Sequence, residues 1–243
     1  MGRTMVVRTS LRRRAREEQR KGDLSGRLIT LHDPSDPASE AYRTLRTGLL
    51  YAVVDAPPRV ISLTSPGPTE GKSTVCANLG VVLAQANKRT LLIDGDLRRP
   101  SLHAVFDLRN INGLVNAITG ERGLSEVLSE PLPNLRVCTS GPVPPNPAEL
   151  LSSNRFAALV EEARQGFDYV LIDSPPVEPV ADPLILATHA DGVLLVLDAQ
   201  RTRKGALRKA LHDLRGVKAN VLGTVMNNFD GKRGGYAYHG YTR

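Results

Sequence analysis

One short segment restricts the fold of this chain more than any other: a loop that ends in Gly-Lys-Ser-Thr at residues 71–74. The apolar run at 60–64 before it is typical of a buried strand, and the stretch 75–86 after it is typical of a helix. In such a strand–loop–helix unit, N–H groups at the helix N-terminus point toward phosphate. Lys72 then reaches the β and γ oxygens, and Ser73 offers a hydroxyl to Mg²⁺. The segment therefore predicts a phosphate-binding loop.

The loop differs from the usual G-x-x-x-x-G-K-[ST] pattern, because Pro66 stands at the place of the first glycine and Gly67 follows one position later. A Gly-Lys-Ser-Thr segment after an apolar run can also arise by chance, so other motifs have to support the interpretation. The candidate nucleotide ligands within the loop are Thr69, Glu70, Gly71, Lys72, Ser73 and Thr74.

The rest of the chain alternates between apolar runs and helical patterns. Strands are expected near 60–64, 90–93, 135–139, 168–172, 192–198 and 220–226. Helices are expected near 40–54, 72–86, 101–106, 113–128, 148–165, 182–189 and 204–215. Continuous apolar strands separated by helices predict an α/β fold of the P-loop NTPase type, in which helices cover both faces of a mostly parallel sheet.

Charge and composition divide the chain into three parts. Of the net charge of +7, residues 1–30 contribute +6, through nine Lys and Arg against three acidic residues. We expect 1–37 to be a basic, flexible arm and linker, 38–229 to be the P-loop domain, and 230–243 to be a flexible tyrosine-rich tail. Because the remainder is nearly neutral, no nucleic-acid partner is expected. The arm is either simply solvated or attracted to an anionic membrane or an acidic partner.

The sequence also predicts a cytoplasmic location. Its apolar runs are shorter than the ~20 residues that a membrane helix needs, and no apolar secretory segment follows the basic N-terminus. Cys76 and Cys138 lack metal-ligand spacing and are expected to be buried thiols in a reducing compartment.

Three aspartates follow two of the apolar runs. Asp94 and Asp96 come after the run 91–93, and Asp173 comes after the run 169–172. Ligands of open parallel sheets bind beyond the carboxyl ends of the strands, so these carboxylates are expected beside the phosphate loop. An aspartate in a turn after a strand is common. Together with the loop lysine and serine, however, the three favour a phosphoryl-transfer site that holds Mg²⁺.

These motifs resemble the Walker A, A′ and B motifs of the bacterial tyrosine kinases, or BY-kinases. The A′ motif reads Asp94-x-Asp96-x-Arg98, and the B motif reads Asp173-Ser-Pro-Pro. The resemblance covers about residue 38 to the C-terminus and implies ATP and Mg²⁺ as cofactors. It also implies catalytic roles for Lys72, Asp94, Asp96 and Arg98, and metal binding by Ser73, Asp94, Asp96 and Asp173.

Within that resemblance, Asp94 activates the tyrosine hydroxyl. Because this hydroxyl has a pKa near ~10, a carboxylate has to accept its proton as the bond to phosphorus forms. Asn227 falls where related P-loop ATPases place an adenine-recognising asparagine, although an Asn-Asn turn explains it equally well.

Two further segments match the family. The helix around 39–47 resembles one with an E-x-x-R-x-x-R oligomerisation motif, and the C-terminal segment resembles a cluster of autophosphorylated tyrosines. The residues concerned are Glu40, Arg43 and Arg46 in the helix, and Tyr236, Tyr238 and Tyr241 in the tail.

The resemblance also implies a biological setting. It predicts a ring-like homo-oligomer of autokinases that regulates capsule or exopolysaccharide synthesis at the inner face of the membrane. Many relatives are fused to a transmembrane activator, so here a separate chain is expected to supply one. One departure is Thr69, which stands where the family usually has glycine.

Two other functions remain open. A deviant-Walker ATPase that positions division sites or partitions plasmids would have a second loop lysine, which would align with Gly67. A nucleotide-binding interaction module without catalysis is disfavoured only by the intact set of Lys72, Ser73, Asp94, Asp96 and Asp173. Eukaryotic-type kinase chemistry is disfavoured, because the Gly-rich loop, His-Arg-Asp and Asp-Phe-Gly motifs are missing.

Overall fold

The structure is a computed structural model, and it describes residues 3–5, 24–51 and 57–229 of the chain. Residues 6–23 of the predicted basic arm and the tail with Tyr236, Tyr238 and Tyr241 lie outside the described residues. Within the described part, no helix has both the length and the apolar character required to cross a bilayer.

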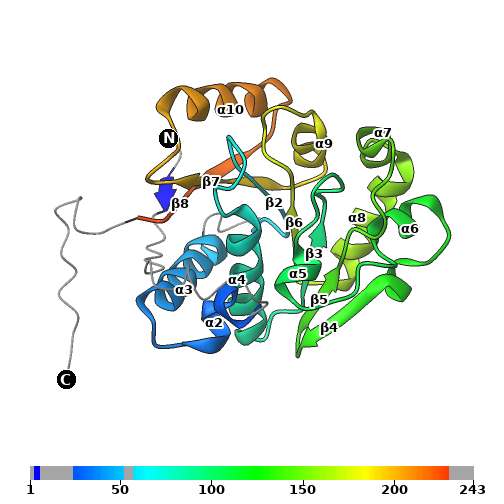
Figure 1. Cartoon of the computed structure of the whole chain (residues 1–243), viewed down its shortest axis with the longest axis horizontal. Helices are drawn as coiled ribbons and strands as arrows, with labels where there is room; N and C mark the ends of the chain where they lie inside the picture. Colours follow the sequence, from blue (N-terminus) through cyan, green and yellow to red (C-terminus); the bar gives the residue numbers. More distant parts are fainter. Residues whose placement is uncertain (1–2, 6–23, 52–56, 230–243) are drawn as a thin grey trace.

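The described strands form one sheet in the order β1-β8-β7-β2-β6-β3-β5-β4 (Figure 1). All neighbours are parallel except β4 and β5, which are antiparallel. The bounds are β1 Arg3–Met5, β2 Val60–Thr64, β3 Thr90–Asp94, β4 Leu128–Leu132, β5 Leu135–Cys138, β6 Tyr169–Asp173, β7 Gly192–Asp198 and β8 Val221–Asn227. The prediction of an α/β fold with a mostly parallel sheet is confirmed.

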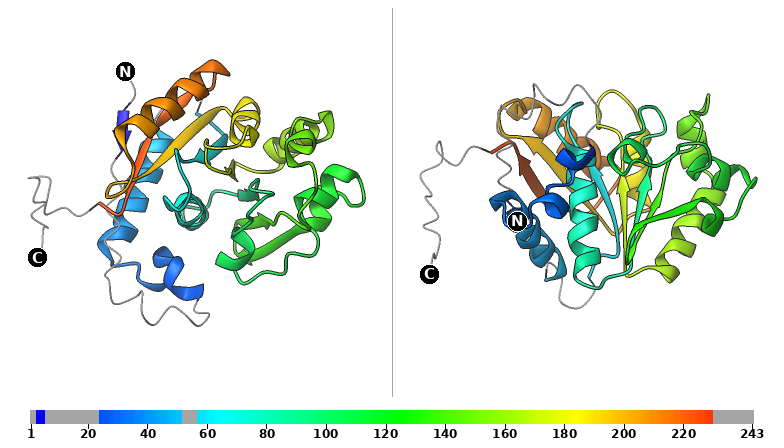
Figure 2. Two further views of the ribbon diagram at one scale, coloured as in Figure 1. Left: turned by 45° about the horizontal axis from the view of Figure 1, so that its top comes forward. Right: turned by 60° about the horizontal axis from the view of Figure 1, so that its bottom comes forward.

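The helices cover both faces of this sheet (Figures 1 and 2). One face carries η1 Leu24–Arg27, α2 Ile29–His32, α3 Pro37–Leu50, α4 Lys72–Gln85 and α5 Leu102–Val105. The other carries α6 Leu114–Thr119, η2 Leu124–Val127, α7 Pro147–Leu151, α8 Asn154–Gly166, α9 Asp182–Thr188 and α10 Lys204–Gly216. Strand β3 shows how the core is divided: Leu92 packs on the α4 face, and Leu91 and Ile93 pack on the α8 face.

Helix α4, which follows the phosphate loop, is buried on all sides. Ten consecutive residues, 75–84, are buried between the sheet and the outer helices α2 and α3. A helix with apolar residues around its whole circumference belongs in a protein interior, and this one has no solvated face along that stretch. The loop before it is therefore mounted on a rigid element.

Several element boundaries differ from the sequence-based expectation. The helix expected near 113–128 is α6 followed by η2, because Gly120 ends α6 in a left-handed conformation with a φ of 82°. The helix expected near 148–165 is two helices, because the hydroxyl of Ser153 accepts a hydrogen bond from the N–H of Phe156 and starts α8. Strands β1 and β4 were not expected. Strand β4 is only partly buried and contains Pro131, which is tolerated at a sheet edge.

The segment before α3 also differs from the expectation of an arm and linker up to residue 37. Residues 24–32 form η1 and α2, and Leu28 and Thr30 are buried against the domain. Helix α3 begins at Pro37, because the carboxylate of Asp36 accepts a hydrogen bond from the N–H of Ala38. This segment therefore belongs to the folded domain. Cys76 and Cys138 are free and buried, as predicted.

Candidate active site

The phosphate loop joins β2 to α4 and leaves the N-terminus of α4 open. Gly71 stands at the N-cap with a φ of 91°, and no side chain caps the helix there. A Cβ on Gly71 would also overlap the side-chain amide of Asn227, so glycine is required on both counts. The first N–H groups of α4 therefore remain available to an anion.

The backbone conformation of Thr69 explains why glycine is usual at its position. It is exposed, and its φ of 62° lies in the left-handed region that a β-branched residue disfavours. The loop keeps this backbone conformation despite the threonine side chain.

Lys72 is the centre of the charge cluster. Its Nζ lies 3.0 Å from Oδ2 of Asp96, 3.5 Å from Oδ1 of Asp173 and 3.3 Å from Oγ of Ser73. Burial by itself would lower the pKa of Lys72, but the charges of Asp173 and Asp96 outweigh it, and the pKa is raised. Lys72 therefore stays cationic, as a group that neutralises phosphate must.

Asp94 is fully buried at the end of β3. Its Oδ2 accepts hydrogen bonds from the N–H groups of Ser101 and Leu102, both at 2.9 Å, and its Oδ1 has no partner. Burial, and next the charge of Asp173, raise the pKa of Asp94 to about 7. A carboxyl with a pKa near neutrality is well matched to accept and return a proton.

Asp173 lies opposite Asp94 in the β3–β6 register and is also fully buried, with Oδ2 unpartnered. Burial raises the pKa of Asp173, while the neighbouring Lys72 and Ser73 oppose that shift. Asp96 faces Lys72, and its Oδ1 accepts from the N–H of Arg99 at 3.0 Å. The structure thus brings together the lysine, serine and three aspartates that the sequence predicted.

These residues fit Mg²⁺ only as part of a shared coordination sphere. Among the described residues, no three His, Cys, Asp or Glu side chains converge as a ready-made metal cage. The unpartnered oxygens of Asp94 and Asp173 are nevertheless buried hard donors beside an open helix N-terminus. Mg²⁺ suits this arrangement, since it is usually held by one or two carboxylates together with substrate phosphates and water.

Arg98 does not lie in this cluster of contacts. Its guanidinium forms a bidentate pair with Asp182, with Nε–Oδ2 at 2.7 Å and Nη2–Oδ1 at 3.2 Å. Asp182 is fully buried in the first turn of α9. This contact fixes the A′ loop to α9. The catalytic role of Arg98 stays a prediction. Sequence reasoning missed Asp182, because no motif marks it.

Asn227 contacts the backbone of the phosphate loop, and the backbone of Thr74 in α4 is itself bound by a side chain of the same helix. The Nδ2 of Asn227 donates to the carbonyl of Glu70 at 3.0 Å, and Asn227 is buried at the end of β8. The carbonyl of Thr74 accepts from Nδ2 of Asn78 at 2.9 Å. The hydrogen bond from Asn227 to the Glu70 carbonyl supports the loop directly. Adenine recognition by Asn227 stays a prediction.

The E-x-x-R-x-x-R residues of α3 make contacts within the chain. Arg43 pairs with the exposed Glu40 at 2.9 Å and donates to the carbonyl of Pro34 at 2.8 Å. Arg46 is partly buried and donates from Nη1 to the carbonyl of Val82, in the last turn of α4, at 3.0 Å. Arg46 therefore acts on the helix that carries the phosphate loop.

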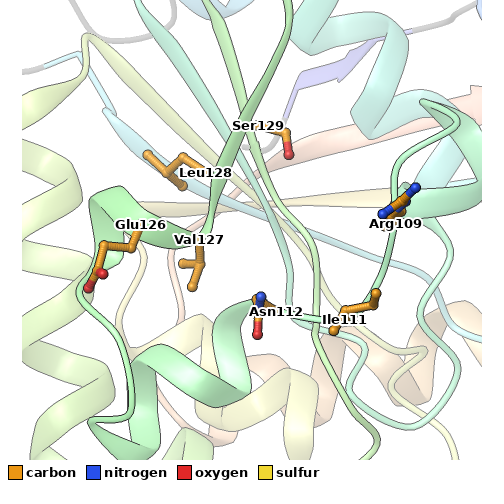
Figure 3. A pocket seen from close by; sticks show the side chains of 7 residues that line it. All are labelled: Arg109, Ile111, Asn112, Glu126, Val127, Leu128 and Ser129. Carbon is orange, nitrogen blue, oxygen red and sulfur yellow. The ribbon is translucent and has the colours of Figure 1, made fainter.

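A separate cavity of about 280 Å³ lies outside this site (Figure 3). It is formed by Arg109, Ile111 and Asn112 on one side and by residues 126–129, where η2 passes into β4, on the other. None of the phosphate-loop residues or strand-end aspartates lines it.

Comparison with known proteins decides the family. The family model described as an AAA domain matches residues 58–225. Tyrosine-protein kinase YwqD of Bacillus subtilis is 41% identical over 228 residues, which cover 93% of this chain and 96% of that protein. The chain belongs to the bacterial tyrosine-protein kinases.

Solved structures agree with this membership. The chimerical protein CapA2B2 matches this kinase with a TM-score of 0.81 and 35% identity, over 84% of this chain and 90% of that one. The kinase domain of Escherichia coli tyrosine kinase ETK also gives a TM-score of 0.81, with 31% identity over 88% and 84% of the two chains. The septum site-determining protein MinD of Pyrococcus horikoshii, at 22% identity and a TM-score of 0.59, shares the fold. The protein is thus a P-loop tyrosine kinase that uses ATP.

Proposed function

We propose that this kinase transfers the γ-phosphoryl group of Mg·ATP to Tyr236, Tyr238 and Tyr241 of a neighbouring copy of the same chain. The observation that carries the proposal is Asp94. It is buried at a strand end, beside the Lys72 cluster, and one of its oxygens is free to accept a proton.

The transfer step follows from the contacts around the loop. The N–H groups of α4 and the ammonium of Lys72 would bind the β and γ phosphates. Ser73, Asp96 and Asp173 would hold Mg²⁺, which leaves Oδ1 of Asp94 to the proton, and the metal would neutralise charge on the phosphate oxygens. The tyrosine oxygen attacks phosphorus, its proton passes to Oδ1 of Asp94, and the bond between the γ-phosphorus and the bridging oxygen breaks to leave ADP.

The acceptor and the assembly rest on sequence features. Three of the six tyrosines of the chain fall within six positions of a Gly-rich tail whose sequence lacks the apolar pattern of a core element. Transfer to a neighbouring subunit would couple the reaction to assembly through Glu40, Arg43 and Arg46. Each added phosphate carries about −1.5 to −2 charge and would repel the aspartates, so the phosphorylated tail would leave the site and loosen the ring.

We also propose the setting in which this kinase acts. A similar solved protein is the chimera CapA2B2, which is compatible with an activator supplied as a separate chain. Such a partner would place the kinase at the inner membrane face, where the basic arm meets anionic lipid. The expected process is capsule or exopolysaccharide synthesis.

Purified protein with labelled Mg·ATP tests the transfer directly. A variant with all three tail tyrosines changed to Phe should bind ATP but lose most autophosphorylation. Mixed with a Lys72→Met protein that keeps its tyrosines, it should label that protein, because the reaction is intermolecular. Phosphate mapped mainly to other residues, or no labelling of the Lys72→Met chain in the mixture, would refute the proposal.

A further inference from the structure

Glu70 connects the phosphate loop to the side of the sheet opposite the aspartates. In the strand order, β6 and β3 with Asp173 and Asp94 lie on one side of β2, and β7 and β8 lie on the other. Glu70 is 6% exposed and is directed to β7 and the loop that follows it. No established motif gives this side chain a role.

Each polar atom of the Glu70 side chain is engaged by the protein. Its Oε1 accepts from the N–H of Gly67 at 3.0 Å. Its Oε2 accepts from the hydroxyl of Thr202 at 2.7 Å and from the N–H of Asp198 at 3.3 Å. The Glu70 carbonyl accepts from Asn227 at 3.0 Å. One residue therefore joins the loop to the ends of both β7 and β8.

The residue before Glu70 has an unfavourable backbone geometry. Thr69 has a φ of 62°, and a threonine keeps such a conformation only where its surroundings fix it. The contacts of Glu70 fix the loop on both sides of Thr69, at Gly67 and at Glu70 itself. A glycine at position 69 would adopt the same φ without that support.

We propose that Glu70 is a positioning residue that holds the phosphate loop in its binding conformation, and that the threonine at position 69 makes the loop depend on it. The inference rests on the proposed placement of the ATP phosphates at this loop. Without the Glu70 contacts the loop would occupy its binding conformation for only a fraction of the time. The apparent dissociation constant for ATP rises by the inverse of that fraction.

A carboxylate is required because three donors converge on Glu70. Glutamine would keep the size of the side chain but would turn an NH₂ group toward at least one of these donors. Glu70→Gln should therefore weaken ATP binding about tenfold by calorimetry, in line with the loss of one or two buried hydrogen bonds. The kcat at saturating ATP should change less than about threefold, since the clamp does not contact the reacting atoms.

The decisive comparison repeats Glu70→Gln in a Thr69→Gly background. There the loss of ATP affinity should shrink to less than about threefold, because glycine no longer needs the support. Thr202→Val removes one donor to Glu70 and should weaken ATP binding in the same direction as Glu70→Gln.

Glu126 provides a matched control. It has the same Gly-x-x-Glu arrangement, in which its Oε2 accepts from the N–H of Gly123 at 2.6 Å, but it belongs to η2 and not to the phosphate loop. Glu126→Gln should leave ATP affinity unchanged. Melting temperatures of all variants establish that each one is folded.

Equal losses of ATP affinity in the wild-type and Thr69→Gly backgrounds would overturn the inference, as would a fall in kcat with unchanged affinity. Lys72→Met separates this inference from the proposed function. If Lys72→Met abolishes phosphotransfer while Glu70→Gln binds ATP normally, only the role of Glu70 is wrong. If Lys72→Met keeps full phosphotransfer, the placement of ATP itself is wrong.

Discussion

The parallel strands carry aspartates at both of their ends, which form the carboxyl edge and the amino edge of the sheet, and the two sets serve opposite purposes. At the carboxyl edge, Asp94 and Asp173 are fully buried, each has an oxygen without a partner, and their pKa values are raised. At the amino edge, Asp168 and Asp191 are partly exposed and well paired, and their pKa values are lowered. The sequence places each of the four directly before or at the end of a strand.

The amino-edge aspartates join neighbouring strands. Asp168, before β6, accepts from the N–H of Arg89 at 2.8 Å, just before β3. Asp191, before β7, accepts from the N–H groups of Arg59 and Val60 at the start of β2, both at 2.9 Å. These carboxylates satisfy backbone groups that strand pairing leaves free, so they stabilise the fold. At the carboxyl edge, one oxygen of Asp94 and one of Asp173 are left without a partner and so remain available to a ligand, which makes the fold less stable there.

Lys72→Met gives the largest expected effect at the carboxyl edge. Removing the ammonium leaves the phosphates and three aspartates without their central positive charge, so phosphotransfer should fall at least about 10³-fold. The methionine fills a similar volume, and the far-UV spectrum should be unchanged. Autophosphorylation at the wild-type rate would show that this edge is not the catalytic one.

Asp94→Asn should separate activity from stability. Phosphotransfer should fall about 10²-fold or more, because no base accepts the tyrosine proton. The melting temperature in EDTA without nucleotide should rise, because a buried carboxylate beside Asp173 is replaced by a neutral group of the same size. A lower melting temperature for this variant would remove the contrast between the two edges.

Asp191→Ala should have the opposite result. It removes the acceptor of the N–H groups of Arg59 and Val60 and of Nη1 of Arg164, so the free energy of unfolding should fall by about 2 kcal/mol. Denaturant unfolding measures this loss, and kcat at a temperature where the variant is folded should match the wild type. A large fall in kcat would mean that the amino edge also contributes to catalysis.

The pH dependence of stability gives the smallest expected effect. Burial alone would raise the pKa of Asp191, but hydrogen bonds from Arg164 and from the N–H groups of Val60 and Arg59 lower it below its usual 3.8. The folded state therefore holds this proton less tightly than the unfolded state does. Its stabilisation is present above pH ~4 and is lost as the pH falls through the lower, folded pKa. Denaturant unfolding between pH 3 and 6 should show a shallower acid slope for Asp191→Asn than for the wild type. Equal slopes would contradict the assignment.

The carboxyl edge could be predicted from sequence because its signals are local. The phosphate loop, its flanking strand and helix, and each strand-end aspartate are read within a few positions of one another. A buried strand also shows itself as a short apolar run, which located β2, β3, β6 and β7. The structure then brought Lys72 within 3.5 Å of Asp173, as the parallel topology requires.

The contacts that were missed join distant segments. Arg98 and Asp182 are 84 positions apart, and Glu70 and Thr202 are 132 apart, so neither pair has a local pattern. Strand β4 was not predicted because it is half-exposed, includes a proline and pairs at the edge of the sheet. The contact of Thr30 with Asn78, at 2.8 Å between Oγ1 and Oδ1, likewise joins α2 to α4 across 48 positions of sequence.

Helix α4 has 14 residues and so is about 21 Å long at ~1.5 Å per residue. Its first residue is Lys72, and the carbonyl of Val82 near its other end is held by Arg46. Because α4 is buried and rigid, a displacement at one of its ends also moves the other end. If drawing Arg46 away from Val82 changes the affinity of the loop for ATP, reciprocity requires that bound ATP favour or oppose that contact by the same factor.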